Sequence, residues 1–297
     1  MPERWKLMWS SRSIRLFLLS IAIGMLAGVA LAVESANGLN LKPGFNIYSR
    51  DQDIQLGKQE AAEIENEVPL LHDAETLHYL NGLLRRLLPY EPLPADYPFE
   101  IRVLNDREIN AFALPGGIIY VNRGTIESAE DEAQLAGAVA HETGHVVMRH
   151  GTHQATEVVL AQFPLAIIDG WLGQSSGTMG DLAQAGLGFG VNSLLLRNTR
   201  ANESQADTIG TYVLYHAGYD PHALARFFEI IKKKDPTRTI QFFSDHPNPE
   251  NRIQAIEAEI PQLGSPVSGR TDTAEFQTIK KRLLGLPSPP KKPKAEE

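Results

Sequence analysis

Two histidines and a glutamate occur as His141-Glu142-x-x-His145 within the segment AGAVAHETGHVVMRH. The alanine, leucine and valine content of this segment favours a helix, and residues four apart on a helix project from the same face. Both imidazoles can therefore reach one cation, whereas Glu142 is rotated about 100° around the helix and lies beside that cation. The pattern is typical of two zinc ligands with a glutamate that serves as general base.

An acidic pair, Glu203 and Asp207, lies four residues apart in a second predicted helix, RNTRANESQADTIGTYVL. That side of the helix is otherwise apolar, so both carboxylates are expected to point inward, where an unpaired charge is costly. Because zinc in a hydrolase takes three protein ligands and one water, Glu203 is the expected third ligand beside His141 and His145. Asp207 can accept a proton from the free nitrogen of a ligand histidine. We therefore predict one zinc ion per chain, although other divalent ions also fit two histidines and a glutamate.

The composition excludes several other kinds of site. The chain contains no cysteine, which removes disulfides, thiolate metal sites, iron–sulfur clusters and a cysteine nucleophile. Its formal charge is −8 and no basic stripe runs through its body, which argues against a nucleic-acid partner. Any metal must be held by histidine, aspartate or glutamate.

The N-terminal residues 1–33 combine a basic head with 18 uncharged residues from Leu16 to Val33. This combination is typical of a signal peptide or an N-terminal membrane anchor. The small residues of Ala30-Leu31-Ala32 favour cleavage, but the apolar stretch also reaches the length of about 18 residues that a spanning helix needs. In both cases we expect the remainder to be exported, to the periplasm or to the periplasmic face of an envelope membrane.

The exported part divides into a linker at 34–50, a metallopeptidase domain at 51–262, and a C-terminal helix with a disordered Pro/Lys-rich tail at 263–297. We expect a mainly helical α+β fold, with short strands at 99–103 and on both sides of Pro115-Gly116-Gly117. Polar residues interrupt the apolar stretches 158–173 and 182–196. These stretches are therefore expected to form a lid or a membrane-facing surface over the site.

Two further motifs carry a family resemblance. Asn-Ala-Phe-Ala-Leu-Pro-Gly-Gly at 110–117, and His246-Pro247 ahead of Arg252, occur in the order and at the separations found in peptidase metallo-family 48 (M48) of the gluzincin class. The chain resembles the exported, single-domain branch of that family over about residues 50–260. The resemblance implies a zincin-like fold, zinc on His141, His145 and Glu203, and a substrate lying along the strand after residue 117. The residues then expected to contact substrate are Gly116, Gly117, Ile118, Ile119 and Tyr120.

Two predicted site residues have more than one possible role. His246 could be a surface residue, a donor to the tetrahedral oxyanion, or a fourth metal ligand that displaces water. The family resemblance implies that such a ligand closes the site in a resting state. Arg252 could pair with Asp207, contact substrate carbonyls, or lie on the surface of its helix.

Together these features predict a zinc endopeptidase that cleaves misfolded or envelope polypeptides, with Glu142 and His246 in the catalytic site and Asp207 and Arg252 supporting it. One alternative is an envelope quality-control factor with a latent metal site. The other is a membrane-embedded hydrolase like the prenyl proteases, which predicts several spanning helices where the chain offers one candidate. Contact with a membrane surface or anchor is expected, and the oligomeric state is left open.

Overall fold

The computed structural model describes residues 39, 41–94, 96–171, 198–234, 242, 245–246, 249–264 and 269–289, with the backbone alone at 162–171 and 249–250. The predicted signal peptide or anchor at 1–33 lies outside the described residues. Within them, no helix has both the length and the hydrophobicity that crossing a bilayer requires.

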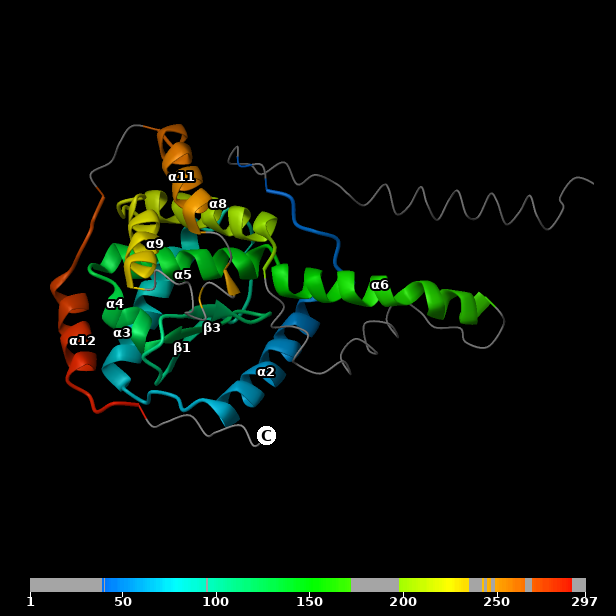
Figure 1. Ribbon diagram of the computed structural model, residues 1–297, viewed down its shortest axis with the longest axis horizontal. Coiled ribbons are helices and arrows are strands. Elements are labelled where there is room, and N and C mark those ends of the chain that lie inside the picture. Colours follow the sequence, from blue (N-terminus) through cyan, green and yellow to red (C-terminus); the bar gives the residue numbers. More distant parts are fainter. Residues whose placement is uncertain are drawn as a thin grey trace, which may run out of the picture.

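Helices dominate the architecture and enclose one small sheet, which confirms the predicted α+β class (Figure 1). The elements follow in the order α2 (Arg50–Glu67), α3 (Ala74–Leu87), the 3₁₀ turn η2 (Leu88–Tyr90), β1 (Glu100–Leu104), β2 (Ala111–Ala113), β3 (Ile118–Asn122), α4 (Arg123–Ser128), α5 (Glu132–Val147), α6 (His150–Trp171), α8 (Arg200–His216), α9 (Ala223–Lys234), α11 (Pro249–Glu259), η4 (Ile260–Gln262) and α12 (Ala274–Leu284).

The sheet has the strand order β1–β3–β2, in which β3 pairs parallel with β1 and antiparallel with β2. The strands expected near 99–103 and around the Pro-Gly-Gly turn are confirmed. Gly116 has a φ of 81°, and a Cβ there would lie 2.5 Å from the Cα of Ile54, so this turn requires glycine. β3 is buried along its whole length, and β2 forms one edge of the sheet.

The helix that carries both histidines, α5, lies between the sheet and helices α8 and α9 (Figure 1). All its residues are buried. Asp131 caps its N-terminus by accepting a hydrogen bond from the backbone N–H of Gln134. Helix α8 packs closely against it, because a Cβ at Gly144 would lie only 3.2 Å from the Cα of Ala206. This close packing fixes the distance between the residues of the two helices.

The C-terminal helix α12 packs into the main hydrophobic core. Phe276 and Leu283 are fully buried in the same cluster as residues of α3 and α5. The buried guanidinium of Arg123 donates hydrogen bonds to the carbonyls of Leu283, Leu286 and Pro287, which tie down the end of the helix. The sequence predicts that the metallopeptidase domain ends at residue 262, before α12. In the structure, however, α12 covers the same core as the elements before that residue.

A buried acid on α2 makes stability dependent on pH. Neither carboxylate oxygen of Glu60 has a hydrogen-bond partner among the described residues, and burial, together with Glu63, raises its pKa from 4.5 to about 8. Between these values the folded chain holds a proton that the unfolded chain has lost. The free energy of unfolding therefore falls as pH rises through this window, by roughly 1 kcal/mol per pH unit.

We expect Glu60→Gln to remove this contribution, so that the variant is more stable than wild type at pH 8 and nearer to it at pH 5. Urea unfolding of both proteins at the two pH values measures the difference. Equal pH dependence in the two proteins would contradict the assignment.

Candidate metal centre

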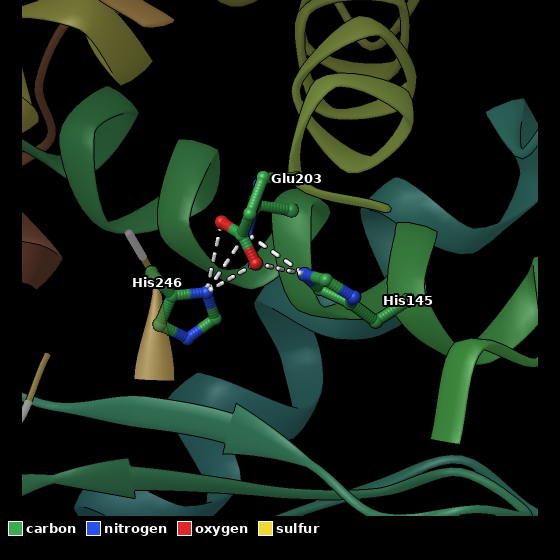
Figure 2. Close-up of side chains that lie close together, drawn as sticks. His145, Glu203 and His246 are labelled. Atoms are coloured by element: carbon green, nitrogen blue, oxygen red, sulfur yellow. Dashed lines mark hydrogen bonds and ion pairs between the residues drawn. The ribbon is translucent and has the colours of Figure 1, made fainter. Parts of the chain in front are cut away.

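Three elements bring four side chains together at one point. His141 and His145 come from successive turns of α5, Glu203 from the first turn of α8, and His246 from the segment before α11. Thr199 caps α8 by accepting a hydrogen bond from the backbone N–H of Asn202, which places Glu203 just inside the helix. Figure 2 shows His145, Glu203 and His246 pointing toward a common centre.

The donor atoms of these four residues lie close to one another. His141 Nε2 is 3.1 Å from His145 Nε2 and 3.4 Å from His246 Nδ1. The Glu203 carboxylate lies 3.4 Å from His145 Nε2, 3.5 Å from His141 Nε2 and 3.1 Å from His246 Nδ1. All four residues are buried. The structure thus brings the three predicted ligands together and adds His246 to them.

The donor set fits a small tetrahedral cation. Zinc bonds to nitrogen and oxygen are about 2.0–2.2 Å long, which makes the edges of a ligand tetrahedron about 3.3–3.6 Å. The separations of 3.1–3.5 Å given above are close to this value, and all the donor atoms lie within 4.8 Å of one another. Three imidazoles and one carboxylate are also ligands that zinc accepts. A cation at this centre would satisfy lone pairs that otherwise face one another.

Opposite charges hold Glu203 ionised in this buried place. Burial raises the pKa of its carboxyl, but His246 and Arg252 outweigh that effect and lower it well below its usual range. Arg252 Nη1 lies 2.6 Å from Glu203 Oε2. Burial lowers the pKa of His145 well below its usual value, which favours the neutral ring that a metal ligand requires.

Asp207 and Arg252 contact His141 on its far side. Burial lowers the pKa of His141, but hydrogen bonds to the carboxylates of Asp207 and Glu203 outweigh it and raise the pKa to about 9. His141 Nδ1 lies 3.0 Å from Asp207 Oδ1, and Arg252 binds both oxygens of Asp207, at 2.7 and 2.6 Å. Of the possibilities for Arg252, the structure shows the pairing with Asp207. It also leaves the Nε2 atom of His141 facing the centre.

Glu142 lines a cavity of about 280 Å³ beside the four donors. Burial raises the pKa of its carboxyl, and its nearest site partner is His246, whose Nε2 lies 3.5 Å from Glu142 Oε1. His145, His246 and Gly116 line the same cavity. A carboxyl group beside the cluster, but not among its four donors, has the position expected of a general base.

The edge of the sheet nearest the cavity is β2. Phe112 and Ala113 of β2 line the cavity, whereas Ile118, Ile119 and Tyr120 belong to the central strand β3. Both edges of β3 are already paired, so a substrate backbone cannot add to it. The expectation that residues 118–120 contact an added strand does not fit this topology, and Gly117, which is not among the cavity residues, lies on the turn that leads into β3.

Sequence reasoning missed His150, which contacts His145, and Gln205, which contacts His150. The sequence contained one indication of this contact: a third histidine, His150, lies nine positions after His141. Arg149, with φ at 58°, separates α5 from α6, so helical spacing from His145 could not have placed His150. The predicted lid at 158–196 lies largely outside the described residues.

Comparison with known proteins agrees with this geometry. Residues 76–260 match the model of peptidase family M48. The beta-barrel assembly-enhancing protease of Escherichia coli (strain K12) is 30% identical over 241 residues, which cover 79% of this chain and 49% of that protein. Mitochondrial metalloendopeptidase OMA1 of Schizosaccharomyces pombe is 30% identical over 225 residues, or 73% of this chain and 64% of that protein. Metalloprotease LoiP of Escherichia coli is 29% identical over 160 residues, or 54% of this chain and 62% of LoiP.

The chain spans about half the length of the beta-barrel assembly-enhancing proteases that it matches. The family match nevertheless extends from α3 to the end of α11 and includes every donor of the cluster. The chain therefore belongs to peptidase family M48.

Proposed function

We propose that this protein is a zinc-dependent endopeptidase that cleaves misfolded or envelope polypeptides. The observation that carries the proposal is the convergence of His141, His145 and Glu203 beside a cavity that Glu142 also lines. Family membership supports the reaction class. The proposed domain spans residues 51–262, preceded by a linker at 34–50.

A zinc ion held by His141, His145 and Glu203 would supply Lewis-acid polarisation of the scissile carbonyl and would lower the pKa of a bound water toward about 7. In our proposal Glu142 accepts the proton of the attacking water and then delivers it to the leaving amine nitrogen. Burial raises the pKa of Glu142, which makes it a stronger base than an exposed glutamate. Asp207 and Arg252 hold the ring of His141 in place.

We propose that an extended peptide pairs with the outer edge of β2. In the β2–β3 pairing, Leu114 N–H bonds to the carbonyl of Ile118, and Asn122 N–H bonds to that of Asn110. Because hydrogen-bonded residues alternate along an antiparallel strand, the backbone groups of Ala111 and Ala113 face the other edge. A substrate strand can use these groups, as in β-augmentation.

Ala113→Pro tests this edge. Its N–H is on the unpaired side, where proline is tolerated, so the sheet should remain intact. We expect kcat/KM for peptides of eight or more residues to fall at least tenfold, with zinc content unchanged. Unchanged cleavage by the folded variant would show that substrates do not pair with β2.

We propose that His246 closes the site in the conformation described. Its Nδ1 joins the donor cluster, while its Nε2 lies 3.2 Å from the carbonyl oxygen of Ala111. A fourth side chain would fill the position that hydrolytic zinc sites leave open for water. The same ring also contacts the Ala111 carbonyl on the proposed substrate edge. Movement of His246 away would therefore free both the fourth metal-ligand position and this carbonyl group.

We expect His246→Ala to cleave unfolded casein several-fold faster than wild type. The zinc-loaded proteins are compared at equal metal content. If kcat falls instead, His246 is a donor to the oxyanion rather than a closing ligand.

The four-donor cluster also favours a second candidate function, a quality-control factor that binds unfolded proteins and remains latent. Hydrolysis of casein by zinc-loaded His246→Ala separates the two. The endopeptidase predicts cleavage that a zinc chelator stops and added zinc restores. A latent binding factor predicts retention of casein without cleavage in both wild type and variant.

We also propose that the chain is exported, by a signal peptide or a single N-terminal anchor within residues 1–33, to face the periplasm. The basic head and apolar stretch of the sequence support this placement. Fractionation followed by N-terminal sequencing of the exported form distinguishes a cleaved signal from a retained anchor. Recovery of the full-length chain in the cytoplasm would contradict export.

A further inference from the structure

A second pair of side chains lies behind His145, on the side away from the donor cluster. His150, in the first turn of α6, is only 2% exposed, and its Nδ1 lies 2.9 Å from His145 Nδ1. The other nitrogen of His150, Nε2, lies 3.0 Å from Oε1 of Gln205 on α8. The chain of contacts therefore runs from His145 through His150 to Gln205.

Hydrogen-bond chemistry determines which atom donates the proton in each of these contacts. A neutral imidazole has one N–H and one acceptor nitrogen, and a close contact between two rings needs one N–H between them. When His145 presents Nε2 to a metal, its proton is on Nδ1, which donates to Nδ1 of His150. The proton of His150 is then on Nε2, where it donates to the carbonyl oxygen of Gln205.

The orientation of Gln205 agrees with this assignment independently. Its Nε2 lies 3.3 Å from the backbone carbonyl oxygen of Lys42, to which it can only donate. This contact turns the amide oxygen, and not the amide nitrogen, toward His150. A backbone carbonyl, which has no alternative protonation, thus fixes the orientation of Gln205, the last residue in this series of contacts.

The two histidines of the motif are consequently held in different ways. Asp207, itself paired with Arg252, accepts from Nδ1 of His141. Among the described residues, His145 has no such carboxylate at its Nδ1 and uses the neutral ring of His150 instead. We propose that His150 and Gln205 are positioning residues that fix His145 in the tautomer and orientation required for metal binding. This inference rests on the proposed metal site at His141, His145 and Glu203.

Metal affinity measured against a chromophoric zinc chelator tests the inference with four variants. Removing a hydrogen-bond partner of a ligand histidine typically weakens metal binding 10–100-fold. We expect such a loss for His150→Leu, and a loss of about tenfold for Gln205→Met, which leaves His150 without its acceptor. His150→Asn retains an oxygen near the Nδ1 position and should bind zinc within a few-fold of wild type.

His153→Leu is the matched control, because His153 lies one turn further along α6 and bonds to the carbonyl of Phe45 outside the site. It should bind zinc as wild type does. Wild-type affinity in His150→Leu would overturn the inference. Circular dichroism of each variant shows whether it has folded.

Nitrogen-15 NMR of the histidine rings in the zinc-loaded wild-type protein tests the same inference without a variant. We expect the proton on Nδ1 of His145 and on Nε2 of His150. A proton on Nδ1 of His150 would overturn the inference while the metal site stands. Failure of the wild-type protein to bind zinc would instead remove the proposed function, and with it the role of this pair.

Discussion

Glu142→Gln is expected to lower kcat for casein or peptide hydrolysis by about 10²–10⁴-fold, the usual contribution of a general base. Glutamine has nearly the same shape as glutamate but cannot accept the water proton. Glu142 is not one of the four converging donors, so zinc affinity should stay within a few-fold of wild type. Turnover numbers are measured at saturating substrate on samples with equal zinc content.

A zinc-loaded Glu142→Gln protein that retains near wild-type turnover would show that another group accepts the proton. Glu60→Gln, the same change at the buried acid of α2, is a suitable control. Glu60 is not among the residues that line the cavity, so its replacement should leave turnover unchanged at a pH where both proteins are folded.

His145→Ala is expected to abolish tight zinc binding and, with it, all hydrolysis above the level of the chelator-treated enzyme. The substitution removes one of the four donors and also the partner of His150. Because α5 is buried and held by α8 and α9, the helix should persist around the small cavity that the change creates.

The comparison of His145→Ala with Glu142→Gln distinguishes the loss of the metal ion from the loss of the general base. Both variants should lose most of their activity, but only His145→Ala should lack zinc in elemental analysis. Stoichiometric zinc in folded His145→Ala would exclude His145 as a ligand.

Local periodicity accounts for the part of the site that could be predicted from the sequence. Residues four apart on one helix must share a face, which brings His141 and His145 together without knowledge of the fold. The apolar neighbours of Glu203 indicate that its carboxylate points inward, and the structure places it against both histidines. In each case the signal lies within a few turns of one helix.

Features that depend on pairing between distant segments could not be obtained in the same way. The order β1–β3–β2 places β2, and not β3, at the edge by the cavity, and three short strands carry no signal for their order. His150 reaches His145 only because the chain leaves α5 through a positive φ at Arg149. The packing of α12 against α3 and α4 likewise depends on contacts between residues more than a hundred positions apart.

The central claim is that one metal ion is held by the histidines of α5 together with the glutamate of α8. X-ray absorption at the zinc edge of the wild-type protein, loaded with one equivalent of zinc, tests it most directly. We predict two or three imidazole nitrogens and a carboxylate oxygen at about 2.0–2.2 Å, the third imidazole being that of His246. A shell of oxygen atoms without imidazole, or failure to retain one zinc per chain, would contradict the account.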